Sequence, residues 1–245
     1  MTQTFDMITA KNRIVVIPDV HGRDFWKKPV ATTSCNKVIF LGDYVDPYYD
    51  EEGVDGQQAL RGFYEVLDLK AKNPKKVVLL LGNHDLHYLS EQFNELAGGD
   101  RFDKELSSVL SDLFHQHKKD FCLAHEELIN GKRYLFTHAG VTSSWYKRHS
   151  KTIKEFTAAN LNHLLKTKRG INALAEVGEL RGGDYLDGSM VWADSDEMRL
   201  SAPIPNVYQV FGHTQQWSAP IIKDHYACLD CRKVFLLDEK GLSVL

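Results

Sequence analysis

Five short motifs combine metal-binding residue types with glycine. They are Asp19-Val20-His21-Gly22, Gly42-Asp43-Tyr44-Val45-Asp46, Gly82-Asn83-His84-Asp85, His138-Ala139-Gly140 and Gly212-His213-Thr214. Each motif alone is weak evidence, because histidine and aspartate are common in loops. Together they hold four of the chain's eleven histidines, which argues against a chance distribution. Imidazole and carboxylate ligands suit manganese, iron or zinc better than magnesium or calcium. The set is too large for one ion and suits a two-metal site that hydrolyses a phosphate ester.

Each motif follows a short apolar run rich in β-branched residues, at 14–17, 37–41, 77–81, 134–137 and 207–211. Runs this short and continuously apolar predict strands that are buried on both faces. Ligands of α/β proteins bind beyond the carboxyl ends of such strands. We therefore expect the five motifs to meet at one crevice.

The segments between these runs have helical spacing of apolar residues. We expect helices near 60–67, 86–96, 106–114 and 153–165, and a hairpin at Asn130-Gly131 between 122–129 and 132–137. The least regular stretch is 178–205. Strands that alternate with helices predict an α/β fold built on one core. We expect one domain over residues 1–245.

The order of the five motifs, across residues 19–214, resembles that of the calcineurin-like metallophosphoesterases. Gly212-His213-Thr214-Gln215 lacks a second histidine, which is similar to the branch of serine/threonine protein phosphatases and bacterial diadenosine tetraphosphatases. The resemblance implies a four-layer α/β/β/α sandwich with two mixed β-sheets.

The resemblance also implies roles for individual residues. Asp19, His21 and Asp43 would hold the first metal ion, and Asp43, Asn83, His138 and His213 would hold the second, with Asp43 as the bridge. His84 would be the general acid, oriented by Asp46. We expect two divalent ions, with manganese first and iron, zinc or nickel as alternatives. In the expected mechanism a metal-bound hydroxide attacks phosphorus in line and His84 protonates the departing oxygen.

One departure from the family pattern concerns phosphate binding. The protein phosphatases usually carry Arg-Gly directly after the last aspartate of the second motif, whereas here Asp46-Pro47 opens an acidic run that reaches Asp55. Another cation must then neutralise the substrate. We predict that Arg181 contacts the phosphate, with Arg199 as the alternative, because guanidinium groups match phosphate geometry.

The expected substrate is a phosphate monoester of a small molecule or nucleotide. A phosphodiester or a dinucleotide pyrophosphate is the second reading, and a serine/threonine phosphoprotein the third, because of Pro47. A non-catalytic module on the same fold would be expected to lose metal ligands and the acid, whereas all of them are present here.

Composition excludes several other classes of protein. The net charge of −3 gives no sign of a broad basic face for nucleic acid. Cys228 and Cys231 form a C-x-x-C pair without the second pair of a structural zinc site, so we expect reduced thiols. Residues 1–7 lack the pattern of a signal peptide, and no run approaches the roughly 18 apolar residues of a membrane span. We expect a cytoplasmic protein with no membrane partner; the oligomeric state stays open.

Overall fold

The computed structural model describes residues 12–48, 53–99 and 101–245. The N-terminal segment 1–7 and residues 49–52 of the acidic run lie outside the described residues. Strands in the described part form two mixed sheets, with orders β11-β10-β1-β2-β3-β4 and β5-β6-β7-β9-β8. In the first sheet β1 to β4 are parallel, β10 pairs antiparallel with β1, and β11 pairs antiparallel with β10. In the second sheet β6, β7 and β9 are parallel.

The strands of the first sheet are β1 (Ile14–Ile17), β2 (Lys37–Phe40), β3 (Val77–Leu80), β4 (Phe121–Cys122), β10 (Phe235–Asp238) and β11 (Gly241–Val244). Those of the second sheet are β5 (Ala124–Ile129), β6 (Lys132–Thr137), β7 (Tyr208–Phe211), β8 (Ile221–Ile222) and β9 (Tyr226–Cys228). The five predicted strands are therefore confirmed as β1, β2, β3, β6 and β7.

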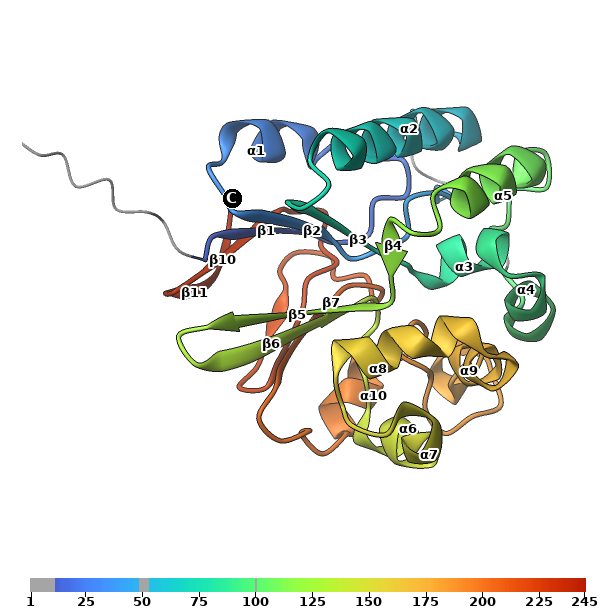
Figure 1. Cartoon of the computed structure of the whole chain (residues 1–245), viewed down its shortest axis with the longest axis vertical. Coiled ribbons are helices and arrows are strands. Elements are labelled where there is room, and N and C mark those ends of the chain that lie inside the picture. The colour runs from blue at the N-terminus through green and yellow to red at the C-terminus, as the bar shows by residue number, and fades with distance from the viewer. Residues whose placement is uncertain (1–11, 49–52, 100) are drawn as a thin grey trace, which may run out of the picture.

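Helices cover the outer faces of the two sheets (Figure 1). On the side of the first sheet are α1 (Lys27–Thr32), α2 (Gly56–Lys72), α3 (Asn83–Leu89), α4 (Glu91–Ala97) and α5 (Ser107–Gln116). Beside the second sheet are α6 (Ser143–Arg148), α7 (Ser150–Ile153), α8 (Ala158–Asn162), η1 (His163–Lys166), α9 (Lys168–Leu174), η2 (Glu179–Arg181) and α10 (Ser195–Leu200). The predicted four-layer sandwich is confirmed.

The strands are apolar on both faces because each sheet packs between another sheet and a helix layer. In β1, Ile14 and Val16 belong to the core between the sheets, together with Phe136 and Val210 of the second sheet. Val15 points the other way, because successive strand side chains alternate between the faces of a sheet.

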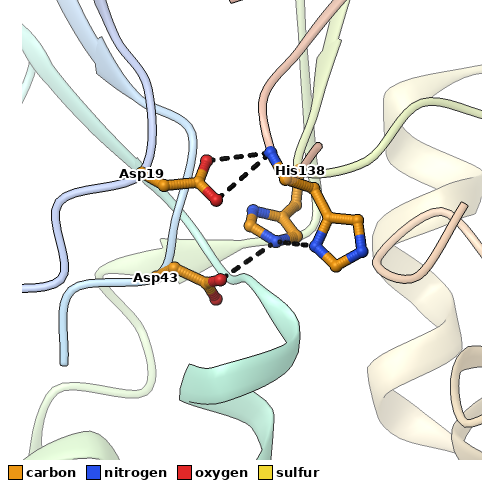
Figure 2. A group of neighbouring side chains, drawn as sticks. Asp19, Asp43 and His138 are labelled. Atoms are coloured by element: carbon orange, nitrogen blue, oxygen red, sulfur yellow. Dashed lines mark hydrogen bonds and ion pairs between the residues drawn. The ribbon is translucent and has the colours of Figure 1, made fainter. Parts of the chain in front are cut away.

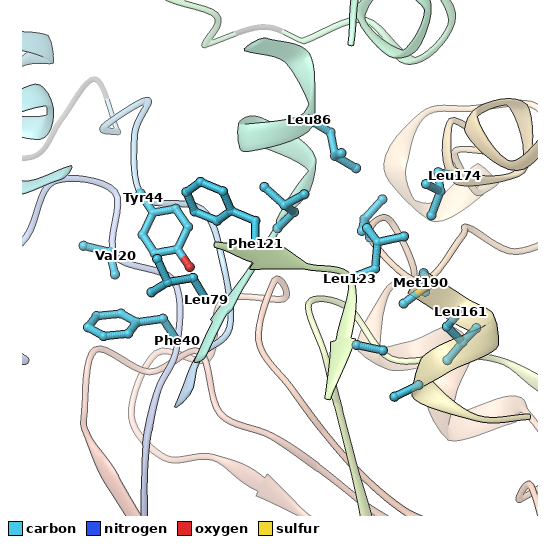
Figure 3. Packing of buried hydrophobic residues seen from close by; sticks show 14 of the residues in the cluster. Val20, Phe40, Tyr44, Leu79, Leu86, Phe121, Leu123, Leu161, Leu174 and Met190 are labelled. Atoms are coloured by element: carbon cyan, nitrogen blue, oxygen red, sulfur yellow. The ribbon is translucent and has the colours of Figure 1, made fainter. Parts of the chain in front are cut away.

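The larger core cluster joins the two halves of the molecule. It extends from Val20 and Phe40 at the first sheet to Leu161, Leu174 and Met190 beside α8 and α9 (Figure 3). Phe40, Leu161 and Leu174 are fully buried. This continuous packing fixes the strand ends of one sheet against those of the other.

Two helix predictions were wrong in their extent. The segment 86–96 is divided between α3 and α4, because Ser90 adopts extended backbone angles and its hydroxyl accepts a hydrogen bond from the amide of Phe93 at 3.2 Å. The segment 153–165 is divided into α7, α8 and η1. Lys154 has a φ of 63° and ends α7, and Thr157 caps α8. Local capping therefore overrides the apolar periodicity in both places.

Two connections also differ from the expectation. Cys122 pairs with Leu80 as part of β4 in the first sheet, so it is not part of the hairpin formed by β5 and β6. The stretch 178–205 holds η2 and α10, whose first turn is closed by a capping box of Asp194 and Glu197. In the part of the chain that the structure describes, no helix has the length and apolar character to cross a membrane.

Candidate metal centre

The predicted ligands follow five strands and meet where the two sheets come together. Asp19 and His21 follow β1, Asp43 and Asp46 follow β2, Asn83 and His84 begin α3 just after β3, His138 follows β6, and His213 follows β7. The first three strands belong to one sheet and the last two to the other. Figure 2 shows the carboxylate of Asp43 directed toward the ring of His138, with the Asp19 carboxylate beside it. Asp19, Asp43, His138 and His213 each offer a ligand atom within 4.8 Å of the others.

His138 Nε2 lies at the centre of the predicted second ion's ligands. It is 3.0 Å from Asn83 Oδ1, 3.1 Å from His213 Nδ1 and 3.4 Å from Asp43 Oδ2. One imidazole nitrogen cannot satisfy three such neighbours with a single proton. Ligand atoms at about 2.1 Å from one ion lie about 3 to 4 Å apart, so these separations fit a shared cation.

Backbone carbonyls fix the tautomer of two predicted histidine ligands. His138 Nδ1 lies 2.9 Å from the carbonyl oxygen of Leu41, and His21 Nδ1 lies 2.8 Å from that of Val45. With the proton on Nδ1 donated to the carbonyl, the Nε2 atom of each ring faces the cluster. Metal-binding histidines are commonly oriented in this way.

Asp43 connects the two predicted ion sites. Its Oδ2 atom lies 3.5 Å from His21 Nε2 and 3.4 Å from His138 Nε2. Asp19 is the third predicted ligand of the first ion, and its Oδ2 atom lies 4.0 Å from His21 Nε2. Both Asp19 oxygens also accept hydrogen bonds from the amide of His213, at 3.0 and 3.2 Å. This contact ties the end of β1 to the end of β7 across the sheets.

Two glycines are needed for this close approach. A Cβ atom on Gly82 would lie 2.0 Å from Asp43 Oδ1, and one on Gly212 would lie 2.2 Å from Asp19 Oδ1. Any larger residue would displace a predicted ligand. The glycines of the third and fifth motifs therefore make room for the carboxylates as well as for the turns.

The pKa values of the clustered histidines are consistent with a site that binds positively charged metal ions. Burial lowers the pKa of His138, but the carboxylates of Asp43 and Asp19 outweigh burial and raise it to about 10. Burial holds the pKa values of His21 and His213 well below the ordinary value, so both are neutral, as metal ligation requires. His213 Nε2 is buried and has no hydrogen-bond partner among residues 12–48, 53–99 and 101–245. The donor set thus fits two divalent ions.

His84 and Asp46 form the predicted acid pair. His84 Nδ1 lies 2.8 Å from Asp46 Oδ2, and the Asp46 side chain is fully buried. The hydroxyl of Tyr88 donates to the other oxygen of Asp46, a contact that the sequence analysis missed. The backbone amide of His84 donates to Asp43 Oδ1 at 3.1 Å. His84 is therefore fixed relative to the bridging carboxylate.

The two arginines predicted for phosphate binding are placed differently. Arg181 lines the cleft, but its guanidinium group pairs with Asp194 at 2.9 Å and donates to the hydroxyl of Thr214 at 2.9 Å. Arg199 pairs with the exposed Asp196 on α10 and does not line this cleft.

A cleft of about 700 Å³ opens over the cluster, lined by His21, Asp43, Asn83, His84 and His213 among others. Arg101 also lines it and was missed by the sequence analysis. No motif surrounds this arginine, which lies 17 residues beyond His84 in the chain. Asp85 is the last residue of the third motif, and the sequence predicts no role for it. It is fully buried and accepts hydrogen bonds from the amides of Asp43 and Tyr44 at 2.8 and 3.0 Å.

Comparisons with known proteins agree with this architecture. A family model described as calcineurin-like phosphoesterase matches residues 12–216. A protein serine/threonine phosphatase from Saccharomyces cerevisiae, with similarity to human phosphatase PP5, is 17% identical with a TM-score of 0.55. That match covers 97% of this chain and 80% of the yeast chain. The phosphoesterase YfcE from E. coli is 13% identical with a TM-score of 0.45, covering 95% of this chain and 92% of its own. At 17% identity, the likeness to the yeast structure shows that the two proteins share a fold and shows nothing more about this chain.

Proposed function

The chain belongs to the calcineurin-like phosphoesterase family and is a metal-dependent hydrolase of phosphoric esters, and we propose that it hydrolyses a phosphate monoester of a small molecule or nucleotide. The position of Asp43 Oδ2 supports the two-ion site on which this proposal depends. One oxygen lies within 3.5 Å of a nitrogen from each half of the ligand set, His21 on one side and His138 on the other. A carboxylate so placed suits a bridge between two ions.

Asp19, His21 and Asp43 would hold one ion, and Asp43, Asn83, His138 and His213 the other. Two bound divalent ions supply an activated water and neutralise charge on the phosphoryl oxygens. Manganese is our first choice of metal, and iron, zinc and nickel also suit the mixed nitrogen and oxygen donors.

The protein's own contribution to the reaction is to place a proton. His84 would deliver a proton from Nε2 to the leaving oxygen, because Nδ1 faces Asp46 and its orientation is fixed from that side. The buried Asp46, itself held by Tyr88, fixes the orientation of the His84 ring so that Nε2 faces the cleft. Arg181 remains our proposed phosphate contact on the side of His213, and it also holds the loop after His213 through Thr214.

A monoester is favoured because of charge. A phosphate monoester is a dianion near neutral pH, and the described cleft adds the guanidinium groups of Arg101 and Arg181 to the two ion sites. The second candidate is a phosphodiesterase or dinucleotide pyrophosphohydrolase. It is supported by the placement of these arginines beside two different predicted residues, Arg101 at His84 and Arg181 at His213, which suits two phosphate groups.

The test is a substrate panel on metal-stripped protein that has been reconstituted separately with manganese, iron, zinc or nickel. We expect p-nitrophenyl phosphate to be hydrolysed faster than bis-p-nitrophenyl phosphate, with manganese giving the highest rate. A preference for the diester, or for a dinucleoside polyphosphate over a nucleoside monophosphate, would favour the second candidate. Hydrolysis of neither ester with any of the metals would refute the proposed function.

A further inference from the structure

We propose that Arg101 binds the phosphoryl group of the substrate and, before substrate arrives, occupies the place beside His84 that the leaving oxygen takes. This inference rests on the proposed function of the same cleft. It assigns to Arg101 the charge that the missing arginine after Asp46 would otherwise supply.

The contacts of Arg101 place its guanidinium group at the reactive end of the cleft. One terminal nitrogen lies 2.8 Å from His84 Nε2, and the other donates to the carbonyl oxygen of Asp46 at 2.6 Å. The group stacks on the ring of Tyr48 at 3.9 Å from its centroid. Tyr48 in turn packs edge-on against His21, with 5.0 Å between the ring centroids. Arg101 is therefore connected both to the predicted acid and to a predicted metal ligand.

No ion pair with a carboxylate holds Arg101 in the part of the chain that the structure describes. Among the described residues, its polar contacts are a carbonyl oxygen and an imidazole nitrogen. Arg181 differs, because it forms an ion pair with Asp194 at 2.9 Å. A phosphate dianion gives a guanidinium group stronger, charge-assisted hydrogen bonds than neutral partners do. An anionic ligand would therefore improve the hydrogen bonds of Arg101 more than those of Arg181.

The contact with His84 also requires Arg101 to move. A guanidinium nitrogen 2.8 Å from His84 Nε2 fills the position from which a leaving oxygen would accept a proton. Arginine has no acceptor atom, so the Nε2 lone pair faces it in this arrangement. Transfer of the guanidinium group to a phosphoryl oxygen would free Nε2 to take up a proton from water, the proton that His84 then gives to the leaving oxygen.

The experiment compares Arg101→Gln and Arg101→Lys with Arg61→Gln. Arg61 is an exposed arginine on α2 whose hydrogen bond is to Gln58. Two measurements are made on manganese-loaded protein: calorimetry gives the affinity for inorganic phosphate, and steady-state kinetics gives kcat and KM for p-nitrophenyl phosphate. Metal content and circular dichroism verify that each variant is folded and loaded.

We expect Arg101→Gln to weaken phosphate binding and raise KM by about 10- to 100-fold, the range for losing a hydrogen bond between charged groups. Arg101→Lys should retain part of the affinity, and Arg61→Gln all of it. Phosphate affinity of Arg101→Gln within about twofold of wild type would overturn the inference. A gain of activity in that variant would also overturn it, since Arg101 would then only obstruct His84.

Failure of the inference and failure of the proposed function give different results. If the wild-type protein hydrolyses neither aryl ester with any of the metals, the proposed function fails. The calorimetric comparison of wild type and variants still tests whether Arg101 binds phosphate. If the wild-type protein is active and the Arg101 variants match it in both measurements, the role of Arg101 alone is refuted. Absence of phosphate binding to the wild-type protein would count against Arg101 as well.

Discussion

Asp85 gives a stability prediction whose size follows from its contacts. Its fully buried carboxylate accepts three backbone hydrogen bonds. Oδ2 accepts from the amides of Asp43 and Gly82, both at 2.8 Å, and Oδ1 accepts from the amide of Tyr44 at 3.0 Å. One side chain therefore ties the loop after β2 to the loop after β3. Replacement by alanine leaves three buried donors without an acceptor.

Each unsatisfied buried donor costs about 1 to 3 kcal/mol, so Asp85→Ala should lower the free energy of unfolding by at least about 3 kcal/mol. For a chain of this size that corresponds to a Tm lower by about 6 to 12 °C. The free energy of unfolding of Asp85→Asn should lie between those of Asp85→Ala and the wild-type protein. Its amide oxygen can replace Oδ2, while its NH₂ group meets the amide of Tyr44 donor to donor.

The assay is thermal unfolding in a chelator, so that loss of metal does not contribute to the difference. Asp68→Asn is the control. Asp68 forms an exposed i,i+4 pair with Lys72, and such pairs contribute about 0.5 kcal/mol or less. A Tm for Asp85→Ala within about 2 °C of this control would refute the reasoning, because it would mean that the three donors find other partners.

Three further predictions concern metal content, catalysis and pH. Asp43→Asn should lower the metal-to-protein ratio at both ion sites and reduce activity by about 10²- to 10⁴-fold, whereas His21→Ala should lose one ion. Retention of two ions by Asp43→Asn, measured by plasma mass spectrometry, contradicts a bridge. His84→Asn should slow hydrolysis of an alkyl phosphate by about 10²- to 10⁴-fold and of p-nitrophenyl phosphate far less; equal losses argue against an acid role. Burial raises the pKa of Asp187, but hydrogen bonds from two hydroxyl groups and Arg148 lower it below 3.8. Asp187 therefore stabilises the fold above pH 3.8 and loses this effect as the pH falls through its folded pKa. In urea unfolding, the free energy of unfolding of the wild-type protein should exceed that of Asp187→Asn by about 2 kcal/mol at neutral pH and by less in acid. A difference that does not change with pH would contradict this assignment.

The strands and the identity of the candidate ligands could be predicted because their signals are local. An apolar run of four or five residues followed by glycine and a polar residue describes a buried strand and its turn without reference to the rest of the chain. Asp19, Asp43 and His138 were chosen in this way, and the structure brings their side chains together. Their roles as metal ligands stay predictions until ions are measured.

The helix breaks were less accessible to sequence reasoning. Ser90 does not interrupt the spacing of apolar residues in 86–96, and Lys154 does not interrupt it in 153–165. The stripe reports burial, whereas the chain direction at these points is set by backbone angles and by caps. Apolar residues recur at the same spacing in one continuous helix and in two short ones, so periodicity cannot distinguish the two arrangements.

The sequence by itself determined which residue types stand at the five strand ends and hence the class of chemistry. Only the tertiary structure decided that Asp43 Oδ2 lies between His21 and His138, that Arg181 is paired with Asp194, and that Arg101 lies against His84. The physical reason is distance along the chain. His138 and His213 are 75 residues apart, and Asp19 and His213 are 194 apart. Their separations in space are fixed by the packing of one sheet on the other, which no local pattern encodes.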